Sequence, residues 1–297
     1  MAARKPRVGF VGYGEAATRF AHDLKRAGVR DIAVYSRSIA KASEGDPARK
    51  RAAAAGVHLA ATPRELCERS DIIIALTPGR TALAALRSLR PYLRADQLYV
   101  DASAAAVKTM EEAGRMLEGR ARFVDAAIMS PVPLNGIKGV IVASGAHAKR
   151  FHALMTPFGM NIQIVGDKPG AASAMKLIRS VCIKGLSAVM LECFEAAQRY
   201  GVLDAVAADI AGSLDERPFA QNMKRYVCGT AVHAARRVHE MTDSLTLLRA
   251  LGASTRMTRA TRAMLIDIEK MGLREKFNAR EPDSIAPVMR AIIDAKR

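Results

Sequence analysis

The sequence predicts an α/β protein in which an N-terminal, doubly wound sheet is followed by an all-α C-terminal domain, with a long helix linking the two. Up to about residue 165, short apolar runs alternate with helical patterns, as in the βαβ units that build a parallel sheet. Between residues 172 and 200 the apolar positions step alternately by three and one, which is typical of a long helix with one buried stripe. No strand pattern follows that helix, so the second half is expected to be helical.

Eight short apolar runs are the expected strands of the sheet. They cover residues 8–11, 32–35, 57–59, 72–76, 98–100, 123–126, 140–143 and 162–164. Helical patterns at residues 16–27 and 47–55 lie between the early runs. This alternation predicts successive parallel strands joined by helices.

The long helix has clear punctuation at both ends. Pro169 and Gly170 stand just before it and Gly201 just after it, and these residue types favour a helix start and a helix stop. Further helices are expected at residues 203–214, 218–225, 229–251, 258–271 and 285–295. We therefore place a domain boundary near Asp167, which gives domains of residues 1–167 and 168–297.

The composition argues against a membrane protein and against a metal or disulfide framework. The longest strongly apolar run in the first half, residues 72–76, is far shorter than the roughly 20 residues of a membrane span. The N-terminus passes directly into a glycine-rich segment without an apolar signal sequence, so a cytoplasmic location is expected. The cysteines form no C-x-x-C pair and predict reduced thiols in helices and no metal site. They are Cys67, Cys182, Cys193 and Cys228.

The charge balance predicts an anionic ligand. The chain has 46 Lys and Arg residues against 29 Asp and Glu, a formal net charge of +17. Such a surface attracts phosphate cofactors, carboxylate substrates or nucleic acid. The basic residues are scattered, without a long Lys/Arg tract, and few aromatic residues are available to stack on bases. We therefore expect a small anionic substrate and no specific nucleic-acid or membrane partner.

A glycine-rich turn follows the first expected strand. Gly12 permits a tight turn, Gly14 lets a pyrophosphate approach the backbone, and Ala17 allows close packing of helix on strand. The N-terminus of the following helix would then face the phosphates. The residues expected to bind a dinucleotide here are Gly12, Tyr13, Gly14, Glu15 and Ala16. A glycine-rich turn without a cofactor is the alternative.

The end of the second expected strand favours NADP(H) over NAD(H). An NAD-binding chain usually has an acidic residue there to hydrogen-bond the ribose 2′-hydroxyl, whereas this chain has Ser36, Arg37 and Ser38. A guanidinium between two hydroxyls suits a 2′-phosphate, and Lys41 is a candidate outer contact. The first carboxylate after the strand is Glu44. The alternative is that Arg37 is a solvated surface residue.

Several short segments stand out along the chain. They are Gly9-x-x-Gly12-x-Gly14, Ala27-Gly28, Ser36-Arg37-Ser38, residues 71–78, Val100-Asp101-Ala102-Ser103, Phe123-Val124-Asp125-Ala126 and Lys176. Their order resembles that of the β-hydroxyacid dehydrogenases, a family that includes 3-hydroxyisobutyrate dehydrogenase, tartronate semialdehyde reductase and 6-phosphogluconate dehydrogenase. The chain resembles this family over most of its length and more closely in the first half. The resemblance implies a Rossmann domain, a long interdomain helix, a helical domain that commonly forms homodimers, and an active site between the domains.

The resemblance also implies roles for particular residues. The segment from Gly170 through Lys176 to Ser180 is similar to the family pattern in which the lysine is the catalytic acid/base and an asparagine orients the substrate; here Ser180 stands in the place of the asparagine. Thr77 and Pro78 would lie along the nicotinamide ribose, and Ser103 would touch the carboxamide.

The loop that holds the substrate carboxylate in the family differs in this chain. Its serine is Ser130, one place later than in the family, and Pro131 and Pro133 bring no amide hydrogens. Arg179 and His239 are further candidates for contact with substrate. These differences indicate a divergent branch with its own type of C-terminal helical domain and a substrate other than the short β-hydroxyacids.

Taken together, the residues and the resemblance predict an NADP-dependent oxidoreductase that interconverts a hydroxyl and a carbonyl group on a small, acidic molecule. Lys176 is the expected general acid/base. One alternative is an imine or ketimine reductase, because similar scaffolds reduce C=N bonds. Another is an NADP-binding sensor without turnover.

Overall fold

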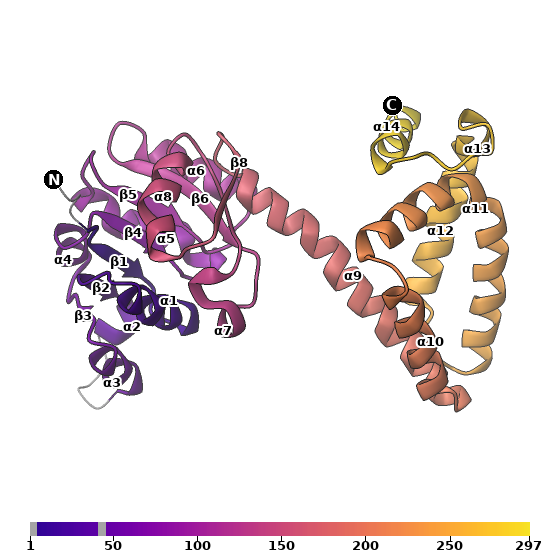
Figure 1. Ribbon diagram of the computed structural model, residues 1–297, viewed down its shortest axis with the longest axis horizontal. Helices are drawn as coiled ribbons and strands as arrows, with labels where there is room; N and C mark the ends of the chain where they lie inside the picture. The colour runs from indigo at the N-terminus through magenta and orange to yellow at the C-terminus, as the bar shows by residue number, and fades with distance from the viewer. Residues whose placement is uncertain (1–4, 41–45) are drawn as a thin grey trace. The chain divides into compact units, whose positions relative to one another are not determined.

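One eight-stranded sheet forms the core of the first half of the chain, in the order β3-β2-β1-β4-β5-β6-β7-β8. The computed structural model describes residues 5–40 and 46–297, without the side chains of residues 47 and 48 (Figure 1). The strands are β1 Val8–Val11, β2 Ile32–Tyr35, β3 His58–Leu59, β4 Ile72–Ala75, β5 Leu98–Asp101, β6 Arg122–Ile128, β7 Ile141–Ser144 and β8 Ile162–Gly166. All eight expected strands are present, and the first six have the order of a Rossmann sheet.

Strand β7 departs from the expected parallel arrangement. It runs antiparallel to β6, with Asp125 opposite Ser144 and Ile128 opposite Ile141. The chain between them forms the four-residue helix α7 (Val132–Asn135) and one 3-10 turn, Gly136–Lys138. A parallel crossover usually needs a helix long enough to lie on the sheet, so this short connection returns the chain in the opposite direction. The expectation of a wholly parallel sheet was wrong for this strand.

The remaining helices lie before, between and after the strands. They are α1 Glu15–Arg26, α2 Arg37–Ala40, α3 Pro47–Ala54, α4 Pro63–Glu68, α5 Ala82–Leu89, α6 Val107–Leu117, α8 Ala148–Met155, α9 Ala171–Tyr200, α10 Leu203–Asp215, α11 Phe219–Ala250, α12 Arg256–Lys270, α13 Leu273–Lys276 and α14 Ile285–Ala295. None of the helices in the described part of the chain is long and apolar enough to cross a membrane.

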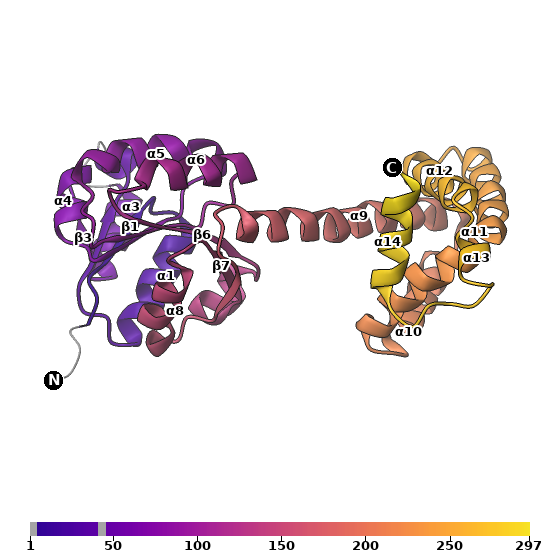
Figure 2. The same cartoon turned by 90° about the horizontal axis from the view of Figure 1, so that it is seen from above.

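Helices cover both faces of the sheet, which explains why its central strands are apolar throughout (Figure 2). On one face Phe10 of β1 packs with Phe20 of α1 and Phe151 of α8. On the other face Ile73 of β4 packs with residues of α4, α5 and α6 such as Leu86. The carboxyl ends of β1, β4, β5 and β6 therefore form one edge of a rigid, buried scaffold.

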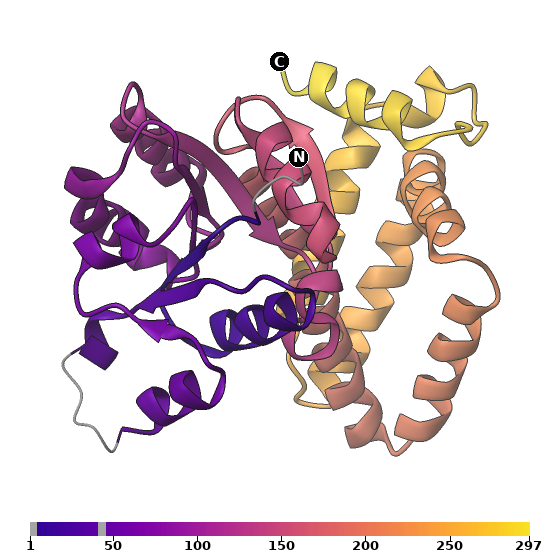
Figure 3. The ribbon, with the colours of Figure 1, turned by 60° about the vertical axis from the view of Figure 1, so that its left-hand side comes forward.

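The chain divides into two compact units, Met1–Ser180 and Val181–Arg297. The boundary expected near Asp167 lies at the start of α9, whereas the units divide within that helix. The early turns of α9 belong to the first unit because Ala172 packs on Ala127 and Val142 of the sheet. In the second unit α11 and α12 lie side by side (Figure 3), and α13 and α14 contribute Leu273 and Val288 to a small apolar core.

Two expectations for the helical half need correction. The helices expected at 218–225 and 229–251 are both within α11, but the kink between its two helical parts is at His233 (φ −113°, ψ 19°), later than expected. The apolar stripe of α9 was expected to be buried. It is buried at Ala196 and Ala197 near the end of the helix, but Ile178 and Val181 are 72% and 76% exposed.

Candidate functional site

A cavity of about 650 Å³ in the first unit opens beside the carboxyl ends of β1, β2 and β4. Among the described residues, it brings together all those expected to bind a dinucleotide except Ser103. These are residues 12–16, residues 36–38, Thr77 and Pro78. A ligand-binding crevice at this edge is the position expected for a doubly wound sheet. The cavity also contains residues of α5 that the sequence motifs did not identify, namely Thr81, Ala84, Ala85 and Ser88.

The glycine-rich turn has the geometry of a phosphate cradle. Gly12 has φ +88°, and a Cβ atom there would lie 2.8 Å from the carbonyl oxygen of Leu76, so only glycine fits. Gly14 is the N-cap of α1 with φ −91°, and a Cβ atom there would meet nothing within 4 Å. Gly14 is therefore not required by the protein itself, and the open space before the N-terminus of α1 suits a bound pyrophosphate.

The strand end that was expected to select the cofactor lies in the same cavity. The hydroxyls of Ser36 and Ser38 are 2.9 Å apart, and Arg37 begins α2 with its side chain exposed. No carboxylate lines the cavity at this end among the residues the structure describes. Lys41 and Glu44 lie outside the described residues. The arrangement leaves a guanidinium and two hydroxyls for a 2′-phosphate.

Thr77 offers the cavity a polar group that a ligand can satisfy. The Oγ1 atom of Thr77 is buried and has no hydrogen-bond partner within residues 5–40 and 46–297. A buried hydroxyl without a partner is costly unless something else satisfies it. The residues present thus fit a dinucleotide, with the turn at its phosphates and Thr77 within the cavity.

Ser103 does not line this cavity. Its backbone N–H and its hydroxyl both donate to Oδ1 of Asp101, at 3.0 Å and 2.5 Å. Burial raises the pKa of Asp101 to about 6, the hydrogen bonds from Ser103 act against that rise, and the nearby charge of Asp125 adds to it. Ser103 therefore holds the turn after β5.

A buried carboxylate fixes the start of α9. Oδ2 of Asp125 accepts hydrogen bonds from the N–H groups of Gly170 (2.9 Å) and Ser173 (3.1 Å) and from the hydroxyl of Ser144 (3.0 Å). The Ser144 oxygen in turn accepts from the N–H of Ala172 at 3.0 Å. These bonds satisfy N–H groups that a helix start leaves without a partner inside the helix. Asp125 is thus a capping residue for α9.

Lys176 is half-buried and lies on the part of α9 that Asp125 holds. Positions 172, 176 and 179 share one helix face, and Ala172 of that face packs on Ala127 of β6. Lys176 thus stands over the carboxyl end of β6, which is two strands from β4 in the sheet and so about 10 Å away. The hydroxyl of Ser180 donates to the carbonyl of Lys176 at 2.9 Å.

Two expected substrate contacts lie beside this face of α9. Nη1 of Arg179 donates to the carbonyl oxygen of Met129, 3.2 Å away. The hydroxyl oxygen of Ser130 accepts from the N–H of Val140 at 3.1 Å. The structure therefore brings Lys176, Arg179 and Ser130 to one end of β6. His239 lies in the second unit, exposed on α11.

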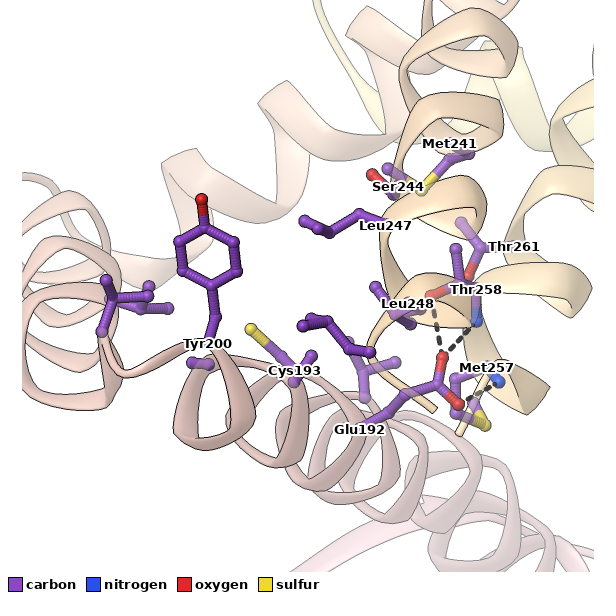
Figure 4. A pocket seen from close by; sticks show the side chains of 16 residues that line it. Glu192, Cys193, Tyr200, Met241, Ser244, Leu247, Leu248, Met257, Thr258 and Thr261 are labelled. Atoms are coloured by element: carbon purple, nitrogen blue, oxygen red, sulfur yellow. Dashed lines mark hydrogen bonds between the residues drawn. The ribbon is translucent and has the colours of Figure 1, made fainter. Parts of the chain in front are cut away.

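The second unit has a cavity of its own, about 530 Å³ and mainly apolar, between α9, α10, α11 and α12 (Figure 4). Glu192 of α9 points from its wall to the start of α12. Its carboxylate accepts hydrogen bonds from the N–H groups of Met257 (3.0 Å) and Thr258 (2.8 Å) and from the hydroxyl of Ser254 (2.8 Å). Burial acts to raise the pKa of Glu192, but these hydrogen bonds outweigh it and lower the pKa to about 2. Glu192 is thus a helix anchor, and no sequence motif identified it.

Two families of known proteins match this chain, one in the first unit and one in the second. Residues 7–105 match the family described as NADP oxidoreductase coenzyme F420-dependent, and residues 197–268 match a domain of unknown function, DUF1932. A conserved protein of unknown function, described as structurally similar to 3-hydroxyacid dehydrogenases, is 30% identical; the match covers 89% of this chain and 98% of that one, with a TM-score of 0.59. An uncharacterized 28.5 kDa protein of Methanothermus fervidus is 26% identical over 89% of this chain and 99% of its own length.

An imine reductase from Myxococcus stipitatus, solved in complex with NADP+, is also similar. It is 19% identical, with a TM-score of 0.76 over 97% of this chain and 100% of that one. At this identity the likeness shows a shared fold.

Proposed function

Because the chain belongs to the 3-hydroxyacid dehydrogenase-like family of oxidoreductases, we propose that it is an NADP(H)-dependent enzyme that interconverts a hydroxyl and a carbonyl group on a small, acidic molecule. The observation that carries the proposal is the cavity that unites the glycine turn, the Ser36-Arg37-Ser38 strand end and Thr77. Three segments far apart in the sequence meet there in the places a dinucleotide needs.

The protein's own contribution to the reaction is proton transfer and orientation. NADPH, when bound, supplies the hydride. Lys176, as an ammonium, donates a proton to the oxygen of the substrate carbonyl; in the reverse direction the neutral amine takes the proton of the hydroxyl. Asp125 holds the helix turn from which Lys176 projects, through its bonds to Ser173 and Gly170.

We also propose that the working form is a homodimer in the cytoplasm. The exposed apolar side chains of α9, such as Ile178, Val181 and Leu191, are 72%, 76% and 73% exposed. Helix α10 is apolar and has no buried residue. Apolar surface on this scale is typical of a protein interface. Sedimentation at working concentration should give twice the chain mass of 32.0 kDa, and a monomer would refute this part.

The experiment that tests the proposal is a titration of the purified protein with NADPH and with NADH, followed by cofactor fluorescence. We expect NADPH to bind at least tenfold more tightly, because Arg37 forms charge-assisted hydrogen bonds to the 2′-phosphate. Selective binding then justifies a screen of hydroxyacids, aldehydes and imines in both directions. Binding of neither cofactor would overturn the proposal, and selective binding without any turnover would favour a sensor.

A further inference from the structure

Arg179 is tied to the end of β6 but keeps one edge of its guanidinium available. Nη1 donates to the Met129 carbonyl, which leaves the Nε–H and Nη2–H pair, the edge that matches the two oxygens of a carboxylate. No Asp or Glu pairs with Arg179 in the part of the chain that the structure describes. Its charge therefore remains available to an external anion.

The loop after β6 offers little else to a carboxylate. Pro131 and Pro133 have no N–H. The Ser130 hydroxyl has one proton to donate, and its oxygen accepts a hydrogen bond from the N–H of Val140. Residues 129–133 carry no charged side chain, so a positive charge beside this part of the loop comes from a neighbouring element.

Helix α9 supplies that charge next to the proposed proton donor. Lys176 and Arg179 are three residues apart, so their Cβ atoms are about 5–6 Å apart on one helix face. No acidic residue occurs in α9 before Glu192. A small oxo acid or hydroxy acid can therefore reach both residues at once, its carboxylate at Arg179 and its reacting oxygen at Lys176.

We propose that Arg179 is the receptor for the substrate carboxylate and so selects a short oxo acid or hydroxy acid over neutral carbonyl compounds. The proposal rests on the function proposed above. In this role the tether to Met129 fixes the guanidinium over the end of β6, so that the anion is held at a set distance from Lys176.

A small carboxylate without a reducible carbonyl carbon tests the receptor without any turnover. The NADPH-loaded protein is titrated with oxamate at constant ionic strength, and its melting temperature is followed; oxamide is the uncharged counterpart. We expect Arg179→Gln to raise the half-saturating oxamate concentration by about 10- to 100-fold, the size of a lost charged hydrogen-bond pair. Arg179→Lys should restore part of the response, and oxamide should give none.

Lys184→Gln is the matched control, because it removes one positive charge from the same exposed helix. An unchanged oxamate response in this variant supports a local receptor, and a loss as large as that of Arg179→Gln would overturn it. Equal responses of the wild type and Arg179→Gln, including none in either, would also overturn the proposal. Tighter binding of inorganic phosphate than of oxamate would overturn the carboxylate assignment. NADPH binding is measured before oxamate is added, so a failure there counts against the proposed function itself.

Discussion

The hydroxyl of Ser173 donates to Oδ1 of Asp125 at 2.7 Å, and Ser173 lies three residues before Lys176 on α9. Both side chains are buried. A strand of the sheet thereby sets the position of the helix turn that carries the proposed acid/base. The link spans 48 residues of sequence, so the two parts of the site are held together by tertiary structure.

Replacing Asp125 should weaken this link measurably. Asp125→Ala leaves buried N–H and O–H groups without an acceptor, and we expect a loss of about 3 kcal/mol in the free energy of unfolding. Urea denaturation followed by circular dichroism measures it. Asp167→Ala, an exposed carboxylate near the same helix start, should change stability by less than about 0.5 kcal/mol. Equal effects of the two variants would show that Asp125 is not the anchor.

Gly14→Ala separates cofactor binding from folding. Its backbone is acceptable to any residue and the space around its Cβ position is empty, so the melting temperature should change by no more than about 2 °C. The affinity for NADPH should fall at least tenfold, because the added methyl group occupies the path of the pyrophosphate. Gly212→Ala on α10, also in open space, is the control that leaves NADPH affinity unchanged. Undiminished NADPH binding by Gly14→Ala would place the phosphates elsewhere.

Arg37→Asp should change the preference between the two cofactors. We expect the dissociation constant for NADPH to rise by about 10- to 100-fold and that for NADH to change little, because only NADPH has the 2′-phosphate. Arg30, which is exposed and lies two residues before β2, is changed in the control variant Arg30→Asp, which corrects for the change in net charge. Fluorescence titration of each variant with each cofactor is the measurement; a parallel loss for NADPH and NADH would refute the role of Arg37.

Lys176→Ala should abolish turnover without abolishing cofactor binding. Loss of a general acid/base typically lowers kcat by about 100- to 10,000-fold, and Lys176 does not line the cavity proposed for NADPH. Lys168→Ala removes an exposed lysine just before α9 and should retain wild-type kcat. Steady-state kinetics on the first substrate found in the screen provides the comparison, and near wild-type kcat in Lys176→Ala would exclude the lysine.

Glu192 makes a pH-dependent contribution to the second unit. Its pKa is lowered from about 4.5 to about 2, so the ionised form is stabilised by folding. That stabilisation is present above pH 4.5 and is lost as the pH falls towards 2. Glu192→Gln should therefore lower the free energy of unfolding, measured by urea denaturation, by about 1–3 kcal/mol at pH 7. The loss at pH 3 should be smaller. An exposed carboxylate, changed in Glu240→Gln, should show no such trend. A constant difference between wild type and Glu192→Gln at both pH values would contradict the assignment.

The sheet and the cofactor cavity were the most predictable parts. Strands such as β1 and β4 are buried on both faces, so their residues form unbroken apolar runs with no competing interpretation. Gly12 and Arg37 could be identified from the sequence because a tight turn needs a glycine and a 2′-phosphate needs a positive charge. Ala84 and Ala85 of α5 line the same cavity. They could not be predicted, because alanine is common in helices whether or not they line a cavity.

The anchors and the exposed helix surface were not predictable in the same way. Glu192 accepts hydrogen bonds from backbone N–H groups about 65 residues away. Because nearly every residue has such a group, no sequence motif marks the partner. A repeating apolar stripe predicts that α9 buries one face, but not whether this chain or another covers it. The hydrogen bond from Ser103 to Asp101 depends on the geometry of the turn after β5, which the sequence does not show.

The division of the chain inside α9 limits how its two halves can be exchanged between related proteins. A junction placed at Asp167 would separate Asp125 from Gly170 and Ser173, which supply three of its hydrogen bonds. A transferred N-terminal portion therefore keeps Lys176 and its anchor to Asp125 together only if it extends to Ser180, where the first unit ends. Any new C-terminal half must then continue α9 as a helix from Val181 onward, so transfer of the half that carries Lys176 constrains the first residues of whatever follows it.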